Sequence, residues 1–462
     1  MANVLENIIH HKRLEVSERK ISQPLETFIA DVTPTSRKFL QALLQPGARF
    51  ILECKKASPS KGLIRANFDL DEIAAVYGKY ADCISVLTDE KFFQGSYTYL
   101  ASMRQKVTQP LLHKDFIIDP YQIYLGRLHG ADAVLLMLSV LSDEEYQHLA
   151  KVAQELGMTV LTEVSNEEET LRAVALKAEL IGINNRDLRT LTTHLETSFR
   201  LARLIPPGTP VVSESGIYFN PQVRKLRKVA KAFLVGSALM AEPDLENAVR
   251  ALVLGTHKVC GLTTAEQAQA VYQAGAYYGG LIFYPASPRA VNLAQAASIV
   301  AAAPLNFVGV FVNETPEQVA LIAHELRLSA VQLHGDEDDA YLQKLRGLLP
   351  KTTAIWKAYR VKDKLPQFSP LADKVMLDSY QQGLPGGTGV RFDWALLQQQ
   401  FAGDFDNKLL LAGGLTPDNV TAALHLPVAG LDMNSGLESA PGVKDPAKIS
   451  QAFQQIREFS YD

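Results

Sequence analysis

The chain has 462 residues, a length that fits two domains better than one. Apolar residues make up 47% and charged residues 21%, which excludes extended disorder. The net charge of −4, from 46 basic and 50 acidic side chains, leaves no basic excess for binding nucleic acid.

The cysteines and the apolar segments narrow the class of protein further. Cys54, Cys83 and Cys260 are odd in number, lie far apart and lack metal-ligand spacing, so a reducing cytoplasm fits and a disulfide framework does not. The N-terminus has no apolar segment long enough for a signal peptide. Residues 267–313 carry one charge, Arg289, but prolines and polar residues interrupt them, so no membrane span is predicted.

Residues 1–45 precede the first predicted strand and contain two amphipathic segments, around Val4–Ile9 and Phe39–Leu44. The pattern favours a simple cover for the barrel over a separate function, and covering the substrate is the alternative. Short apolar runs then alternate with helical patterns such as 69–80 and 143–156. Strands are predicted at 50–53, 83–87, 111–114, 133–138, 159–163, 180–184, 211–213 and 232–235.

The second half repeats this count. Its strands are predicted at 258–260, 280–283, 307–312, 330–333, 354–357, 375–378, 409–412 and 429–432. Eight strands with intervening helices, twice, predict an α/β protein with two (β/α)8 TIM barrels in one chain, residues 1–255 and 256–462. An open doubly wound sheet produces the same alternation, and only the strand count favours barrels.

Ionisable and polar residues end several strands of the first half, where a βα-barrel places its reactive groups. Glu53 and Lys55 alternate onto one face of the first strand, and Lys114, Glu163 and Asn184 end three others. Two carboxylates and two lysines at one barrel mouth predict paired acid/base catalysis. A structural ion-pair network is the alternative.

Small residues follow the last two strands of each half. Loops at these places commonly bind phosphate in βα-barrels, because backbone N–H groups can approach the anion closely. The small residues of one half alone would indicate only an ordinary turn. Their occurrence at matching positions in both halves favours two phosphorylated ligands. The candidates are Ser215, Gly216, Gly236 and Ser237 in the first half and Gly413, Gly414, Ser435 and Gly436 in the second.

These residues carry a family resemblance. The first half resembles indole-3-glycerol-phosphate synthase through ECKKASPSKG (53–62), LHKDF (112–116), LTEV (161–164), GINNRDL (182–188) and SESGI (213–217). The second half resembles phosphoribosylanthranilate isomerase through KVCGLT (258–263), FYPASPR (283–289), VQLHG (331–335), LD (377–378), GGTG (386–389) and DMNSGLE (432–438). One departure is Asn434, where many relatives have serine. The whole chain is similar to the fused bifunctional enzymes of tryptophan biosynthesis.

For the second half, the resemblance implies an Amadori rearrangement of N-(5-phosphoribosyl)anthranilate, with Asp378 as the acid and Cys260 as the base. Lys258 lies on the same face as Cys260 and could favour its thiolate. The Arg289 guanidinium is expected to hold the anthranilate carboxylate by two parallel hydrogen bonds. Residues 386–389 lack the ending of a P-loop and are expected to form a loop that covers the substrate.

For the first half, the resemblance implies ring closure, loss of CO₂ and loss of water. Lys114 is the expected proton donor to the carbonyl, and nearby carboxylates should keep it charged. The base and second acid are among Glu163, Glu53 and Lys55, whose roles the sequence does not divide. Asn184 is expected to position a substrate hydroxyl, Ser58 and Arg186 to contact the aromatic or carboxylate end, and Glu214 to orient its neighbours.

The reactions need no metal and no cofactor, and the expected partners are small phosphorylated substrates alone, with the chain a monomer. Two rival readings remain. A non-catalytic metabolite sensor could use two phosphate-binding barrels, but it would not need both acids and bases. Related isomerases of histidine synthesis are expected to carry a carboxylate where Cys260 stands.

Overall fold

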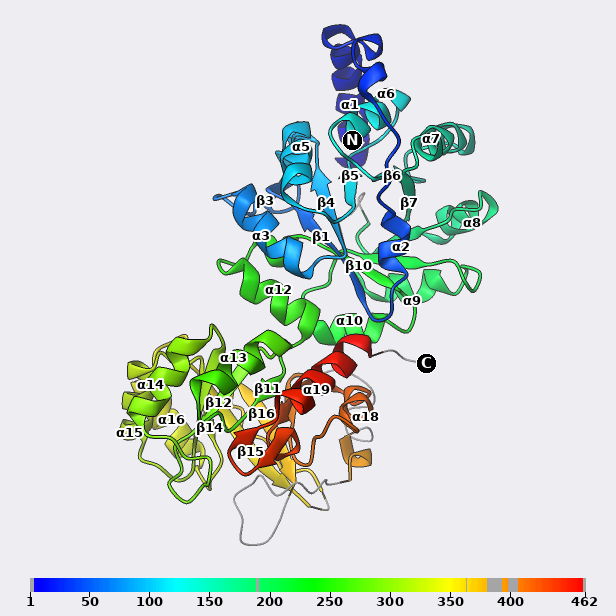
Figure 1. Cartoon of the computed structure of the whole chain (residues 1–462). Helices are drawn as coiled ribbons and strands as arrows, with labels where there is room; N and C mark the ends of the chain where they lie inside the picture. Colours follow the sequence, from blue (N-terminus) through cyan, green and yellow to red (C-terminus); the bar gives the residue numbers. More distant parts are fainter. Residues whose placement is uncertain (1–3, 188–190, 363, 380–392, 398–405, 460–462) are drawn as a thin grey trace. The chain divides into compact units, whose positions relative to one another are not determined.

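The computed structural model describes residues 4–187, 191–362, 364–379, 393–397 and 406–459. Within them, the chain forms two closed barrels of eight parallel strands (Figure 1). By internal contacts it divides into two compact units, residues 1–218 with 222–249 and residues 219–221 with 250–462. The prediction of two TIM barrels is confirmed, and the open doubly wound sheet is excluded because both sheets close. No helix in the described ranges has the length and apolar character needed to span a membrane.

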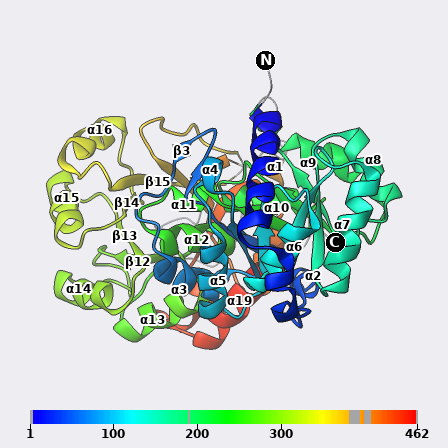
Figure 2. The same cartoon turned by 90° about the horizontal axis from the view of Figure 1, so that it is seen from above.

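In the first barrel, each strand pairs with the next along the chain, and the last strand closes on the first. Figure 2 shows α5, α6, α7, α8 and α9 succeeding one another around it. The strands are β1 (Arg49–Cys54), β4 (Cys83–Leu87), β5 (Leu111–Lys114), β6 (Ala133–Met137), β7 (Thr159–Val164), β8 (Ile181–Asn184), β9 (Val211–Glu214) and β10 (Ala232–Val235). The helices are α1 (Val4–Ser22), α2 (Phe39–Leu43), α3 (Leu70–Tyr80), α4 (Glu90–Phe93), α5 (Tyr97–Lys106), α6 (Pro120–Leu128), α7 (Asp143–Glu155), α8 (Glu167–Ala175), α9 (Glu196–Ala202), α10 (Asn220–Leu226), α11 (Ser237–Met240) and α12 (Leu245–Leu254).

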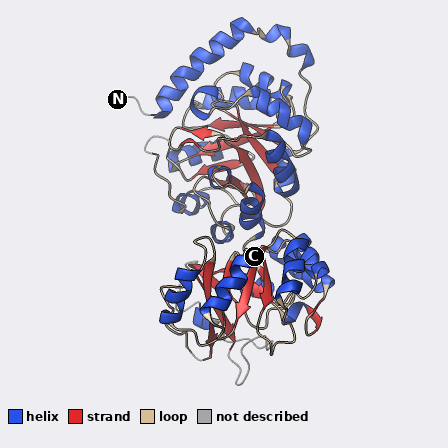
Figure 3. Cartoon of the chain, turned by 90° about the vertical axis from the view of Figure 1, so that its left-hand side faces the viewer, coloured by secondary structure: helices blue, strands red, loops and turns tan. Residues whose placement is uncertain are grey.

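The second barrel repeats this order, with helices around the strands in Figure 3. Its strands are β11 (Lys258–Val259), β12 (Tyr278–Ile282), β13 (Asn306–Phe311), β14 (Ala330–Leu333), β15 (Ala354–Val361), β16 (Lys374–Ser379), β17 (Asp406–Leu411) and β18 (Val428–Met433). Its described helices are α13 (Ala265–Ala274), α14 (Leu293–Ala302), α15 (Pro316–Glu325), α16 (Asp339–Leu348), α18 (Val420–Leu424) and α19 (Pro446–Glu458). Two short hairpins, β2 (Ala57–Ser58) with β3 (Gly62–Leu63) and β19 (Glu438–Ala440) with β20 (Val443–Lys444), follow β1 and β18.

Helix α7 illustrates why the helices form where the periodicity predicts. Ser142 caps its first turn in a capping box with Glu145, which satisfies N–H groups that lack a helical partner. Tyr146, Leu149 and Val152 lie three residues apart and are buried against the barrel. The same logic of a polar cap followed by an apolar stripe places α3, whose N-cap is Asp69.

The strand interior explains how polar groups reach one end of the first barrel. Ile51, Leu112, Leu161 and Val212 lie in one buried apolar cluster. Because side chains alternate along a strand, the residue two positions later points to the same face. Those residues are Glu53, Lys114, Glu163 and Glu214. The apolar cluster therefore sets the direction of four ionisable side chains at the carboxyl ends of the strands.

The second barrel follows the same rule. Val308, Ala330, Trp356, Met376 and Leu410 form a buried apolar cluster. Two residues beyond Met376 comes Asp378, and the next alternate residue after Lys258 is Cys260. Both side chains thus emerge at the carboxyl ends of their strands, where Cys260 packs against the buried Ile282 and Val310.

The N-terminal helix α1 is fastened to the first barrel by a buried cation. Lys12 is 1% exposed, and its Nζ lies 2.9 Å from Asp89 Oδ2 and 2.9 Å from Asp115 Oδ1. Burial alone would lower the pKa of Lys12, but the charges of Asp115 and Asp89 outweigh it and raise the pKa. Asp115 directly follows Lys114, so α1 is held next to the carboxyl end of β5.

Replacing Lys12 with methionine should destabilise the first barrel by about 3–5 kcal/mol, because two buried carboxylates lose their cation. Lys20→Met is the matched control on the same helix, since Lys20 pairs with Asp119 near the surface and should cost less than about 1 kcal/mol. Hydrogen exchange of the β4 and β5 amides measures the opening free energy. Equal losses in the two variants would contradict the buried-cation account.

Candidate active sites

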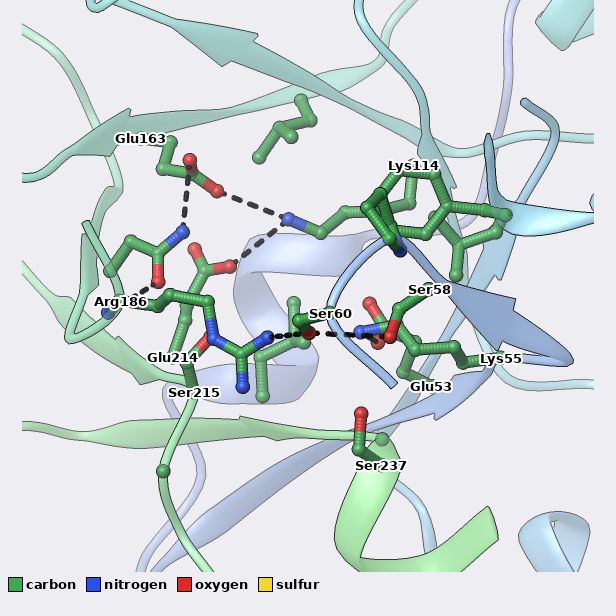
Figure 4. A pocket seen from close by; sticks show the side chains of 18 of the residues that line it. Glu53, Lys55, Ser58, Ser60, Lys114, Glu163, Arg186, Glu214, Ser215 and Ser237 are labelled. Carbon is green, nitrogen blue, oxygen red and sulfur yellow. Dashed lines mark hydrogen bonds and ion pairs between the residues drawn. The ribbon is translucent and has the colours of Figure 1, made fainter. Parts of the chain in front are cut away.

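A pocket opens at the carboxyl ends of the first barrel's strands, and Figure 4 shows its polar side chains pointing toward one another. All twelve first-half site residues predicted from the sequence line it: Glu53, Lys55, Ser58, Lys114, Glu163, Asn184, Arg186, Glu214, Ser215, Gly216, Gly236 and Ser237. Val4, Leu5 and Ile8 of α1 also line this pocket, so the N-terminal segment lies at the site as well as packing on the barrel.

Lys114 is the centre of the charged network. Its Nζ donates to Glu163 Oε2 at 3.1 Å and to Glu214 Oε2 at 3.2 Å (Figure 4). The Asn184 amide donates to the other oxygen of Glu163 at 3.2 Å. The lysine therefore sits between two carboxylates, and the amide fixes the orientation of one of them.

The charges of these groups are strongly interdependent. Burial alone would lower the pKa of Lys114, but the carboxylates of Glu214 and Glu163 outweigh burial and raise it. Burial raises the pKa of Glu214 to about 7, although Lys114 acts in the opposite direction. Lys114 thus keeps its proton at neutral pH, as an acid catalyst must before it reacts. Glu214 changes charge near neutrality.

Two glycines make room for the carboxylates. A Cβ at Gly182 would collide with Glu214 Oε1, and a Cβ at Gly236 would collide with Glu53 Oε1. Glu53 Oε1 in turn lies 2.5 Å from Lys55 Nζ, so the alternation along the first strand produces an ion pair. Glycine at both positions lets buried carboxylates approach neighbouring strands.

The phosphate candidates of the first half lie on the turns after β9 and β10. Ser215 and Gly216 have φ of +67° and +77°, so this turn is left-handed at two successive residues. Gly236 precedes α11, which begins at Ser237. Both turns line the same pocket and can present backbone N–H groups to an anion there.

Arg186 lies across this pocket and is held by its neighbours. Its Nη1 donates to Ser60 Oγ at 2.7 Å and its Nε to Thr193 Oγ1 at 3.2 Å. The backbone N–H of Arg186 donates to Asn184 Oδ1 at 2.9 Å. Ser58 starts the turn that carries Ser60, and its Oγ accepts from the Lys61 N–H. Arg186 and Ser58 are thereby joined through one loop.

A second pocket lies at the matching end of the second barrel. It is lined by Cys260, Arg289, Asp378, Gly413, Gly414 and Ser435, which are six of the seven residues predicted for this half. The seventh, Gly436, is not among the lining residues. A Cβ there would collide with the Leu415 carbonyl oxygen, so close packing of the turn accounts for this glycine.

Cys260 is buried beside a cation. Lys258 Nζ donates to Asp432 Oδ2 at 2.9 Å, and the same ammonium acts on the Cys260 thiol. Burial raises the pKa of Cys260, and Lys258 opposes that rise without cancelling it. Lys258 therefore favours the Cys260 thiolate, as expected. Burial has the larger effect on the pKa, so the thiol holds its proton at neutral pH.

Asp378 is 5% exposed and faces His334. Its Oδ1 accepts from the Ser379 N–H at 2.8 Å, and its Oδ2 lies 3.5 Å from His334 Nε2. A Cβ at Gly413 would lie 2.8 Å from Asp378 Oδ1, so the turn with Gly413 at φ +86° and Gly414 at φ +62° approaches this carboxyl closely.

Arg289 has a partner that the sequence did not reveal. Its Nε and Nη2 donate to Glu438 Oε1 and Oε2 at 2.9 and 2.8 Å. One edge of the guanidinium is thus occupied in parallel geometry by a protein carboxylate, and a substrate carboxylate can use only the remaining N–H groups. The sequence predicted a carboxylate ligand for Arg289, and the structure adds Glu438 as a second carboxylate bound to the same guanidinium.

The predicted substrate-covering loop at residues 386–389 lies outside the described residues. Across the parts of the chain that are described, no three histidine, cysteine, aspartate or glutamate side chains gather closely enough to hold a metal ion.

Comparison with known proteins identifies both halves. The family model of indole-3-glycerol phosphate synthase matches residues 5–252, and that of N-(5'-phosphoribosyl)anthranilate isomerase matches residues 257–455. The tryptophan biosynthesis protein TrpCF of Vibrio cholerae is 55% identical over 99% of this chain and 97% of its own length. This chain belongs to the family of fused synthase–isomerase enzymes.

A second fused relative agrees in length and sequence, and a solved single-domain enzyme matches one half of the chain. TrpCF of Salmonella typhi is 52% identical over 99% of this chain and 100% of its own. A solved phosphoribosyl anthranilate isomerase from Thermus thermophilus is 30% identical over 44% of this chain and 98% of its own, with a TM-score of 0.39. The two family models and the TrpCF relatives show that the chain is a bifunctional enzyme of two successive steps of tryptophan biosynthesis, with the synthase in the N-terminal half and the isomerase in the C-terminal half.

Membership decides between the readings left open by the sequence. A metabolite sensor and a pair of histidine-pathway isomerases are both excluded, because each half matches its own enzyme family. Sequence reasoning missed Glu438, Asp432, His334 and Lys12. All three of Glu438, Asp432 and His334 stand within the recognised motifs. Asp432 in β18 and His334 directly after β14 also had a strand-end position as a signal, whereas Glu438 begins the hairpin strand β19. Lys12 gave no signal, since its two aspartates are far away in the sequence.

Proposed function

We propose that the isomerase barrel uses Asp378 as the acid that protonates the ribose ring oxygen and Cys260 as the base that removes the C2 proton. The ring opens as its C1–O bond breaks, and loss of the C2 proton gives the enol that becomes the ketone. Support comes from the burial of both groups in one pocket. Since the thiol holds its proton, the Lys258 ammonium has to stabilise the thiolate when it forms.

In the synthase barrel, we assign Lys114 as the donor to the carbonyl oxygen while the aromatic carbon attacks. Loss of CO₂ and then of water completes the indole ring. The observation that carries this assignment is the position of the Lys114 ammonium between Glu163 and Glu214. Glu163, Glu53 and Lys55 supply the base and the second acid, and Glu214 orients Lys114.

The remaining roles concern binding. The turns Ser215–Gly216 and Gly236–Ser237 would hold the phosphate of the synthase substrate, and Gly413–Gly414 with Ser435 that of the isomerase substrate. Arg186 and Ser58 would contact the aromatic end, Asn184 a substrate hydroxyl, and Arg289 the anthranilate carboxylate through its unoccupied edge. We place the change between the two enzymes between Leu254, the end of α12, and Lys258, the start of β11.

The direct test supplies the purified full chain with N-(5-phosphoribosyl)anthranilate and follows the absorbance of the ring-closed product. Formation of indole-3-glycerol phosphate and one CO₂ per substrate, without added metal or cofactor, is the expected result. A chain that consumed the substrate but stopped before releasing CO₂ would contradict the synthase assignment.

A further inference from the structure

A buried charged network lies behind the isomerase pocket and involves residues with no role so far. Glu438 accepts from two nitrogens of Arg289 and also from Lys444 Nζ at 2.8 Å. Lys444 donates further to Asn434 O at 3.2 Å and Asn434 Oδ1 at 2.9 Å. The side chains of Lys444 and Glu438 are 1% and 4% exposed.

This network joins the two ends of the proposed ligand site. Arg289 is assigned to the carboxylate end, and Asn434 lines the pocket next to Ser435 at the phosphate end. Gly261, directly after Cys260, lies between them with φ +72°. A Cβ at Gly261 would be 2.7 Å from Arg289 Cδ and 2.9 Å from Asn434 Oδ1. The backbone after Cys260, the Arg289 side chain and the Asn434 side chain are therefore in close contact.

We propose that Glu438 and Lys444 are positioning residues of the isomerase: Glu438 fixes the direction of Arg289, and Lys444 ties Glu438 to the phosphate turn through Asn434. This inference rests on the roles proposed above for Arg289 and the turn. The inference also gives Asn434 a function, because the side-chain oxygen of Asn434 accepts from Lys444. The Lys444 ammonium then has three acceptors, which are Asn434 O, Asn434 Oδ1 and Glu438 Oε1.

Electrostatics agree with this geometry. The hydrogen bonds and charges of Arg289 and Lys444 outweigh burial, which alone would raise the pKa of Glu438, and lower it. Glu438 is therefore a carboxylate, and the alternative to positioning is that it competes with the substrate carboxylate for Arg289. Positioning and competition make opposite predictions, because removal of Glu438 weakens carboxylate binding in the first case and strengthens it in the second.

Two competitive inhibitors of the isomerase reaction separate the ends of the site: anthranilate reports on Arg289, and inorganic phosphate on the turn. In the full chain, Glu438→Ala should raise the inhibition constant of anthranilate about tenfold or more and leave that of phosphate within about twofold. Lys444→Met should raise both. Arg289→Ala combined with Glu438→Ala should match Arg289→Ala alone, as expected for residues that act through one another.

Lys344→Met is the matched control, since it removes a surface ion pair with Glu317 in the same barrel and should change neither constant. Should Glu438→Ala or Lys444→Met fail to fold, Glu438→Gln and Lys444→Gln keep one polar contact and should shift the constants less, in the same directions. Synthase turnover on supplied isomerase product checks each preparation.

Tighter or unchanged anthranilate binding in Glu438→Ala, with weaker binding in Arg289→Ala, would overturn the inference alone. An unchanged phosphate constant in Lys444→Met would overturn the part concerning the turn. If Arg289→Ala itself left anthranilate binding unchanged, the role proposed for Arg289 would fail, and the inference with it.

Discussion

Replacement of Lys114 by methionine is expected to lower synthase turnover by about 10²–10⁴-fold, because the carbonyl oxygen loses its proton donor. Methionine keeps the unbranched side chain up to the position of Cε but leaves Glu163 and Glu214 facing each other without the ammonium that now separates them. The effect should fall on turnover more than on KM, since the phosphate turns are untouched.

The measurement is single-site turnover on supplied isomerase product, with isomerase turnover of the same preparation as an internal standard. Lys151→Met, on the exposed face of α7, is the matched control. The isomerase rate should stay within about twofold of the unmodified chain, because its residues lie in the other unit. Parallel loss of both activities would contradict two independent sites.

The complementary change is Asp378→Asn, which should lower isomerase turnover by about 10²–10⁴-fold. Asparagine preserves the shape of the side chain and can still accept from the Ser379 N–H, but it cannot donate an acidic proton to the ring oxygen. Synthase turnover on supplied product should not change.

Asp373→Asn offers a stringent control, since Asp373 precedes the opposite end of the same strand, β16, and accepts from the Ile355 N–H. The assay follows the disappearance of N-(5-phosphoribosyl)anthranilate. Equal losses of isomerase turnover in Asp373→Asn and Asp378→Asn would show that disturbing β16, and not removing the Asp378 carboxyl group, causes the loss.

The sequence predicted the architecture well because each barrel strand is a short apolar run whose position is fixed by local chemistry. The bounds of β4, β5, β10 and β14 match the predicted ranges, and the other strands differ by a few residues at either end. Differences of that kind arise where backbone pairing with neighbours extends a strand, as in β15, which pairs with β16 up to Val361. Pairing of this kind depends on the neighbouring strand and is not encoded locally.

The sequence also brought Glu53, Lys55, Lys114 and Glu163 to one pocket, because side-chain alternation and strand ends determine their direction. The sequence could not show which side chains form hydrogen bonds or ion pairs with one another. Arg289 and Glu438 are separated by 149 residues, and only the closed barrel places them in contact. The sequence also could not show whether burial or the charge of Lys258 has the larger effect on the pKa of Cys260. In the structure burial has the larger effect, so this pKa rises although Lys258 lies beside the thiol.

The central claim is that two complete and separate sites on one chain perform the two steps. An equimolar mixture of Lys114→Met and Asp378→Asn, supplied with N-(5-phosphoribosyl)anthranilate, tests it most directly. Each variant alone should form indole-3-glycerol phosphate at least about a hundredfold more slowly than the unmodified chain. The mixture should form it much faster than either variant, after a lag, as the product of one chain diffuses to the other. A mixture that stays as inactive as its components would contradict the claim.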